Sequence, residues 1–165
     1  MKVKRIAIVT GATGGLGREF VRHLLKEKNV DEIWVLARNE KKLSRLKEKF
    51  GKKIKIYSID LSSVRQIKCF GEELHEEVGR KNLEISYLVN NAGFAKFCSY
   101  GDLSVEESLN MMHVNMDAVV AMGLVCIPYM KKGSHMINIA SQASFQPLPY
   151  QNIYSSTKSF VRNYS

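Results

Sequence analysis

The chain has 165 residues, which is the length of one domain with a hydrophobic core of its own. Hydrophobic residues make up 45% and charged residues 25%, and these shares exclude a disordered chain, a collagen-like chain and a disulfide scaffold. The formal net charge is +9, from 25 basic against 16 acidic residues, which raises the question of a nucleic-acid partner.

Short apolar runs and amphipathic stretches alternate along the chain. The apolar runs predict five buried strands, at 5–10, 33–37, 54–59, 85–89 and 136–140. Apolar residues at helical spacing predict the helices between them, at 16–25, 43–50, 64–78, a long one at 105–130 and a last one from near 150 onward. The second half of the long helix is apolar nearly all round, so it must be covered on more than one side.

Strands that alternate with helices indicate parallel pairing with crossover helices. Strands in such a sheet are covered on both faces, which explains their uninterrupted apolar runs. The sequence shows no internal repeat, no low-complexity segment and no linker. We therefore predict a single α/β domain over residues 1–165, built on a doubly wound parallel sheet.

The basic residues concentrate between positions 38 and 55, where nine basic and two acidic residues leave a local charge of +7. The simplest interpretation is a solvated helix face. The alternative is that this charge attracts an anionic ligand toward one edge of the molecule. Basic and aromatic residues do not interleave in this chain, so no nucleic-acid partner is predicted.

The cysteines and histidines do not form the pattern of a disulfide framework or a metal site. Cys69, Cys98 and Cys126 are odd in number, widely spaced and without a CxxC pair, and the histidines are scattered. Reduced thiols favour a cytoplasmic location. The longest apolar run, 118–127, has ten residues, whereas a bilayer needs about 20, so we expect a buried helix and no membrane partner.

A glycine-rich turn joins the first predicted strand to the first predicted helix. The strand leads directly into residues 10–17, which read TGATGGLG, with Gly11, Gly15 and Gly17 spaced as GxxxGxG. Glycines at such a turn let the backbone approach a pyrophosphate whose charge lies at the helix N-terminus. A tight turn without a ligand is the alternative, and the position between strand and helix counts against it.

Four further motifs follow, and with them the chain resembles the short-chain dehydrogenase/reductase family. The family's TGxxxGxG motif matches the glycine-rich turn, and its NNAG motif after strand four matches residues 90–93. Its long-helix asparagine matches Asn115, and its serine after strand five matches Ser141, thirteen residues before the tyrosine. Its YxxxK pair matches Tyr154 and Lys158. The resemblance spans the whole chain.

This resemblance implies a Rossmann sheet with strand order 3-2-1-4-5 and an oxidoreductase that interconverts a small-molecule carbonyl and an alcohol by hydride transfer. It assigns Tyr154 as general acid/base and gives Lys158 a second role on the nicotinamide ribose. By the same resemblance, Ser141 bonds the substrate oxygen and Asn115 positions a water in a proton relay. The residues expected to contact the cofactor are Gly11, Thr13, Gly14, Gly15, Leu16, Gly17, Arg38, Asp60, Leu61, Asn91, Ala92, Gly93, Tyr154 and Lys158.

The spacing of Tyr154 and Lys158 supports this chemistry without the resemblance. A free tyrosine has a pKa of about 10, which is too high for proton exchange near neutrality. A lysine at i+4 places its ammonium beside the phenol. At about 5 Å and an effective dielectric of ~20, it favours the phenolate by about 3 kcal/mol, or roughly two pKa units. The alternative is two polar residues on an exposed helical turn.

The end of the second strand predicts the choice of cofactor. An NAD enzyme places Asp or Glu there to bind the ribose 2′-hydroxyl, whereas this chain has Leu36-Ala37-Arg38. Arg38 can stack on adenine and pair with a 2′-phosphate, so NADP(H) is favoured over NAD(H), with a plain surface arginine as the alternative. Asp60 is either the family's adenine-contacting aspartate or a cap for the next helix.

The last third of the family's sequence has no counterpart here, and the chain stops at 165 in mid-helix, which indicates a truncated domain. We therefore expect negligible turnover, and the alternative function is nucleotide binding without catalysis. Strand five is expected to be an unprotected sheet edge. In the family, the long helix (105–130) and the last helix pack against a second subunit, so a homo-oligomer is expected.

Overall fold

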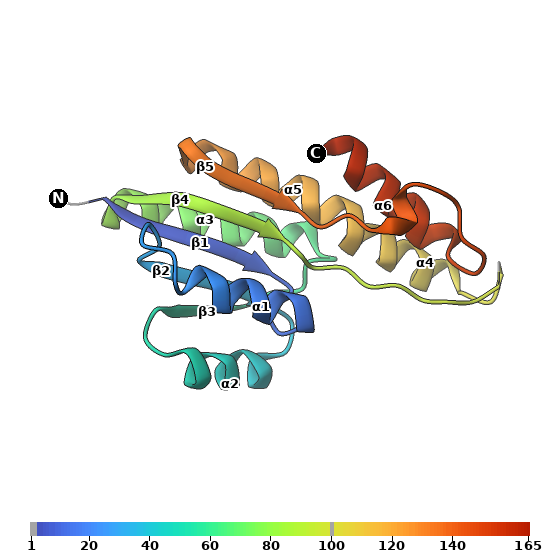
Figure 1. Cartoon of the computed structure of the whole chain (residues 1–165), viewed down its shortest axis with the longest axis horizontal. Coiled ribbons are helices and arrows are strands. Elements are labelled where there is room, and N and C mark those ends of the chain that lie inside the picture. The colour runs from blue at the N-terminus through green and yellow to red at the C-terminus, as the bar shows by residue number, and fades with distance from the viewer. Residues whose placement is uncertain (1–2, 100) are drawn as a thin grey trace.

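The computed structural model describes residues 3–99 and 101–165 (Figure 1). Its five strands form one sheet in the order β3-β2-β1-β4-β5, and every pairing is parallel, which confirms the predicted doubly wound α/β fold. The strands are β1 Lys4–Thr10, β2 Glu32–Ala37, β3 Ile54–Ser58, β4 Leu83–Asn90 and β5 Met130–Asn138. Because all of them run in one direction, their carboxyl ends meet at the same edge of the sheet.

Helices cover both faces of the sheet. They are α1 Gly15–Leu24, α2 Glu40–Phe50, α3 Val64–Lys81, α4 Val105–Met112, α5 Ala118–Cys126 and α6 Asn152–Tyr164. Figure 1 shows α1 and α2 in front of the sheet and α3 and α5 behind it. The α4 helix continues the line of α5 past the carboxyl edge of the sheet, and α6 packs beside it there.

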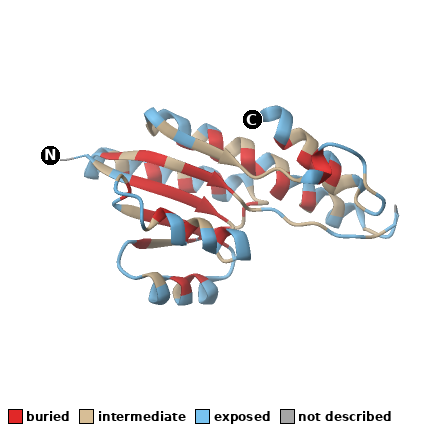
Figure 2. Ribbon diagram, viewed as in Figure 1, coloured by how far each residue is buried: buried red, intermediate tan, exposed pale blue. Residues whose placement is uncertain are grey.

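Two apolar clusters hold the layers together, one on each face of the sheet. Ile6 and Ile8 of β1 pack with residues of α3 and α5, whereas Ala7 and Val9 pack with residues of α1 and α2. This split arises because successive side chains of a strand point to opposite faces. The central strands are therefore buried on both sides, as their uninterrupted apolar runs predicted, while β5 at the edge is much more exposed (Figure 2).

Strand β5 differs from its prediction, because it spans Met130–Asn138 rather than 136–140. Its first half is polar and irregular: Gly133 has a φ of +91°, and the Lys131 backbone N–H donates to Ser134 Oγ at 3.0 Å. The register with β4 shifts within this stretch. An edge strand can expose such residues to solvent, so no apolar run marks where it begins.

The long helix predicted at 105–130 is confirmed at Val105–Tyr129, but it is not α-helical throughout. The α4 helix passes into a π-helix, η1 (His113–Asp117), then into α5, and a 3-10 turn, η2 (Ile127–Tyr129), ends the stretch. A π segment inside an α-helix widens the backbone locally and often marks a functional site. Here it carries Asn115, whose side chain is fully buried.

Among the described residues, one helical stretch, Val105–Tyr129, is long and apolar enough to cross a membrane by length and composition. Ala118, Met122 and Cys126 from this stretch pack in the core against the sheet. A core helix of a soluble protein passes the same test, so the stretch is weak evidence for a membrane span.

Candidate active site

The glycine-rich turn is the tightest part of the site. Gly11 has a φ of +62°, and a Cβ built on it would lie 2.8 Å from the Ala92 Cα. A Cβ on Gly17 would overlap the Gly11 carbonyl oxygen. These two positions therefore need glycine because the backbone of the turn, the start of α1 and the end of β4 pass so close together.

A network centred on Thr10 and Asn91 fastens this turn to the NNAG motif. The Thr10 hydroxyl donates to the Val89 carbonyl at 3.3 Å and accepts from the backbone N–H groups of Asn91 and Ala92, both at 3.0 Å. Asn91 Nδ2 donates to the carbonyls of Thr10 at 3.0 Å and Gly11 at 3.2 Å. The two motifs, about 80 residues apart in sequence, thus form one rigid unit.

The N-terminus of α1 is left open by this arrangement. Its N-cap residue, Gly14, has no side chain to bond the first backbone N–H groups of the helix. A Cβ on Gly15 would meet nothing within 4 Å, and the Leu16 side chain is 53% exposed. Free N–H groups at a helix N-terminus suit a phosphate group, so this turn fits a dinucleotide pyrophosphate.

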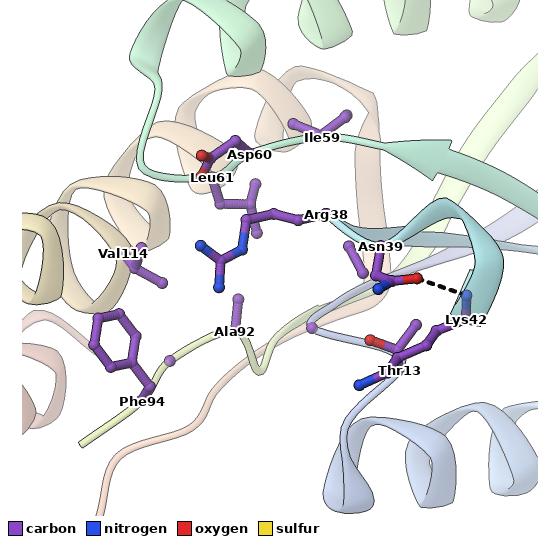
Figure 3. Close-up of a pocket in the computed structure, with 13 residues that line it drawn as sticks. Thr13, Arg38, Asn39, Lys42, Ile59, Asp60, Leu61, Ala92, Phe94 and Val114 are labelled. Atoms are coloured by element: carbon purple, nitrogen blue, oxygen red, sulfur yellow. Dashed lines mark hydrogen bonds between the residues drawn. The ribbon is translucent and has the colours of Figure 1, made fainter. Parts of the chain in front are cut away.

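A cleft of about 590 Å³ lies beside the turn at the carboxyl edge of the sheet. Its lining includes the following predicted cofactor contacts: Gly11, Thr13, Arg38, Asp60, Leu61, Ala92 and Gly93. Figure 3 shows the Arg38 guanidinium extending into the middle of the cleft, between Leu61 and Ala92. The cleft therefore has the position and the charge expected for the adenosine end of a dinucleotide.

Asp60 does not cap helix α3. Its Oδ1 accepts from the backbone N–H of Ser62 at 3.0 Å and from the Ser62 hydroxyl at 2.8 Å. The N-cap is Ser63, whose hydroxyl accepts from the Gln66 backbone N–H. The cap interpretation of Asp60 is therefore wrong, and the carboxylate remains at the wall of the cleft.

Sequence reasoning missed several residues that line this cleft. Asn39 caps α2 by accepting from the Lys42 backbone N–H at 2.9 Å, and both residues face the cleft beside Arg38. In Figure 3 the Lys42 side chain extends toward Thr13. The position of Asn39 directly before a predicted helix was a usable signal for the cap, whereas no signal placed Lys42 at the cleft. Phe94 and Val114 complete the apolar wall, and no motif marked them.

Asn115 joins the loop after β4 to helix α6. Its Oδ1 accepts from the Phe94 backbone N–H at 3.0 Å, and its Nδ2 donates to the Phe94 carbonyl at 3.0 Å and to Thr157 Oγ1 at 3.1 Å. Both N–H hydrogens of the Asn115 amide are therefore donated to protein acceptors. The water-positioning role expected from the resemblance stays a prediction, and the carbonyl oxygen is the atom with capacity left for it.

Lys158 lies where three motifs converge. A Cβ on Gly93 would lie 3.1 Å from Asn115 Oδ1 and 3.4 Å from Lys158 Nζ, so the NNAG motif, the π-helix and the YxxxK pair meet at one point. Lys158 is 5% exposed, and its Nζ donates to the Ile139 carbonyl at 2.6 Å. Burial lowers the pKa of its amine below the ordinary lysine value.

Tyr154 and Ser141 are the other predicted catalytic residues, and with Asn115 and Lys158 they form what we call the catalytic end of the molecule. The Lys158 Nζ lies 5.9 Å from the centre of the Tyr154 ring, one helical turn away on α6. Ser141 follows β5 and caps a short 3-10 turn, η3 (Gln142–Ser144), by accepting from the Ala143 backbone N–H at 3.2 Å. Its hydroxyl hydrogen remains free to meet a substrate oxygen in this geometry.

Metal-ligating side chains do not gather near these residues: within the described ranges, no group of three or more histidine, cysteine, aspartate or glutamate residues could hold a metal ion.

Comparison with known proteins gives consistent matches. A family model described as short chain dehydrogenase matches residues 5–165. An NADP-dependent 3-hydroxy acid dehydrogenase of Escherichia coli K12 is 31% identical over 163 residues, which cover 97% of this chain and 63% of that protein. The human very-long-chain 3-oxoacyl-CoA reductase is 30% identical over 171 residues, covering 96% of this chain and 52% of the reductase.

Solved structures agree with these matches. The crystal structure of serine dehydrogenase from Escherichia coli aligns with a TM-score of 0.84 and 31% identity, over 97% of this chain and 73% of that one. A closed form of serine dehydrogenase complexed with NADP+ aligns equally well, over 63% of its chain. The chain therefore spans about 63% of the length of the bacterial relative it matches.

Proposed function

The chain belongs to the short-chain dehydrogenase family, and we propose that it acts as an NADP(H)-dependent oxidoreductase that interconverts a carbonyl and an alcohol. One observation carries the proposal: Gly93, Asn115 and Lys158 converge beside Tyr154, at the same sheet edge as the open glycine-rich turn. This arrangement sets a proton-carrying side chain next to a dinucleotide cleft.

The residues of the cleft and turn would hold the cofactor. The first N–H groups of α1, at Gly15 to Gly17, would bind the pyrophosphate, and Asp60 and Leu61 would flank the adenine. Lys158 would reach the nicotinamide ribose. When bound, NADP(H) supplies the hydride for reduction of the carbonyl and accepts it in the oxidation of the alcohol.

Tyr154 would carry the proton. In reduction its hydroxyl gives a proton to the carbonyl oxygen, and in oxidation the phenolate takes it back. Lys158 supports the phenolate because its ammonium is largely removed from water, where its field is weakly screened. Ser141 would hold the substrate oxygen with its free hydroxyl hydrogen, and Asn115 fixes the loop that bounds the site.

Two cations support a preference for NADP(H) over NAD(H). Arg38 and Lys42 both line the cleft, and the end of β2 carries no carboxylate that would bind a ribose 2′-hydroxyl or repel a 2′-phosphate. The bacterial relative is named as NADP-dependent, and a closed serine dehydrogenase structure holds NADP+. Arginine and lysine beside a phosphate would give several charge-assisted hydrogen bonds.

Binding measurements test the cofactor assignment. The dissociation constants of NADPH and NADH are compared in the parent chain and in Arg38→Asp. The parent is expected to bind NADPH more tightly, and the substitution is expected to weaken NADPH by about 10- to 100-fold, because one charged pair is lost and a repulsion is added. Lys68→Asp makes the same charge change on the exposed face of α3 and should leave the ratio unchanged. A parent that prefers NADH contradicts the assignment.

Nucleotide binding without turnover is the second candidate, because the open glycine-rich turn and the cleft would bind a nucleotide whether or not a substrate is reduced. We also propose that the protein is a soluble cytoplasmic protein. It would assemble into a homo-oligomer through α4, α5 and α6. Incubation with NADPH and a panel of ketones separates the two functions: oxidation of NADPH supports the oxidoreductase, whereas tight binding without oxidation supports the second candidate.

A further inference from the structure

A second pocket, of about 400 Å³, lies apart from the cofactor cleft. The loop that follows β4, the first turns of α4 and the first turn of α6 form its walls. Tyr154 is part of this wall, and none of the residues that line the cofactor cleft is shared with it. A ligand in this pocket would therefore contact Tyr154 without displacing a dinucleotide.

The wall of this second pocket is mainly aliphatic. The side chains that make it so are Leu103, Val105, Leu109, Met111 and Ile153. They come from two segments distant in sequence, residues 103–111 and the first turn of α6, so folding is needed to bring them together. A volume of this size falls in the range that holds small organic ligands.

Among the described residues that line this pocket, Lys96 carries the one formal charge, and it is already paired. Its Nζ forms an ion pair with the Glu107 carboxylate on the first turn of α4. The Cys98 backbone N–H is also occupied, because it donates to the Tyr150 carbonyl at 3.2 Å. A carboxylate in the pocket would have to share Lys96 with Glu107 while it loses its own water, which disfavours charged substrates.

We propose that this pocket holds the hydrocarbon chain of the substrate, so that the protein acts on uncharged aliphatic ketones and the matching secondary alcohols. The inference rests on the proposed function, which places the carbonyl at Tyr154. The chain of the ketone then extends from the phenol along the aliphatic wall toward Leu109. Each methylene buried there is expected to tighten binding about fourfold.

Calorimetric titration with a series of ketones tests the proposal. The parent chain, with saturating NADP+ so that no reduction occurs, is titrated with 2-butanone, 2-hexanone, 2-octanone and 3-oxobutanoate. The expected result is affinity that rises with chain length and is weakest for 3-oxobutanoate. Tighter binding of 3-oxobutanoate than of 2-octanone, or affinity independent of chain length, overturns the proposal.

Matched variants locate the binding surface. Leu109→Asn, at a side chain 44% exposed on the pocket wall, is expected to weaken 2-octanone by about tenfold or more. Leu124→Asn makes the same change at a 65% exposed leucine on α5, away from the pocket, and should have no effect. Equal losses in both variants overturn the assignment of the pocket.

A third variant tests the role of charge. Glu107→Gln keeps the hydrogen-bonding group that caps α4 but releases Lys96 from its ion pair. It is expected to tighten 3-oxobutanoate several-fold and to leave 2-octanone unchanged; no gain for the anion counts against the proposal. Titration of cofactor-free samples of the same proteins with NADPH keeps the two hypotheses apart, since a chain that binds ketones by length but not NADPH refutes the proposed function alone.

Discussion

The glycine-rich turn and the catalytic end of the molecule are held in place by opposite means. At the turn, Gly11 and Gly17 are required because no space exists for a side chain. At the catalytic end, Asn115 and Lys158 are buried polar side chains, and each is fixed by hydrogen bonds that it makes itself. A substitution that adds a Cβ atom should therefore destabilise the glycine-rich turn. A substitution that removes a polar group should destabilise the catalytic end.

The largest expected effect is at the catalytic end. Tyr154→Phe removes the hydroxyl that we propose to carry the proton, so the NADPH-dependent ketone reduction measured for the parent is expected to fall by about 10²- to 10⁴-fold, while NADPH binding stays the same. Turnover is followed by NADPH absorbance, and binding by titration. Tyr87→Phe, which keeps the ring stacked on His135, serves as the control. A Tyr154→Phe protein that retains most of its rate contradicts the assigned role.

The next effect is on stability at the same end. Asn115→Ala leaves the Phe94 backbone N–H and carbonyl without their partner, which is expected to cost about 2–4 kcal/mol in the free energy of unfolding. Urea denaturation measures the loss. Asn110→Ala, on the same helical stretch at a partly exposed position, should cost much less. Similar losses for the two variants would show that the bonds of Asn115 do not hold the loop.

The sequence predicted the fold well because the central strands are buried on both faces. Residues such as Ile6 to Val9 form an apolar run that needs no knowledge of their neighbours to be recognised. The polar first half of β5 gave no such signal, since an edge strand can expose Lys131 and Lys132 to water. The π-helix was not predicted either, since no sequence pattern marked it, and its Asn115 bonds a loop 21 residues earlier in the chain.

For the candidate site, too, the sequence predicted some residues and not others. Motifs placed the turn, the NNAG segment and the YxxxK pair at one sheet edge, because parallel strands bring their carboxyl ends together. The function of Lys42 and the pairing of Lys96 with Glu107 were out of reach, since both depend on where side chains meet in space. The choice between the two interpretations of Asp60 likewise needed the coordinates that show Ser63 as the cap.

A matched pair of substitutions tests the claim about space at the turn. Gly17→Ala is expected to destabilise the protein by about 1–3 kcal/mol, because its Cβ would overlap the Gly11 carbonyl. Gly15→Ala places the same methyl group where nothing lies within 4 Å, so stability should be unchanged or slightly raised. Thermal or urea unfolding compares the two, and equal losses would mean that glycine is needed there for another reason.

The smallest effect concerns the core that both regions share. Cys126 on α5 is fully buried, and burial raises the pKa of its thiol to about 12. In the unfolded chain the thiol ionises near pH 8.5, so above that pH the unfolded state loses a proton that the folded state keeps. Since the folded pKa is the higher one, stability is complete below about pH 8.5 and falls as the pH rises toward 12.

This loss should amount to about 1 kcal/mol between pH 8.5 and 9.5, and Cys126→Ala should abolish it. The unfolding free energy is read from the fluorescence of Trp34, the single tryptophan, which lies in the same cluster as Cys126. Cys69→Ala, at an exposed thiol, is the control.

If one core supports both regions, the Gly17→Ala and Asn115→Ala proteins should show the same alkaline slope as the parent, because each still unfolds as a unit with Cys126 inside. A slope that persists in Cys126→Ala would assign the alkaline loss to another group, and a slope that differs between the two variants would show that the turn and the catalytic end unfold separately.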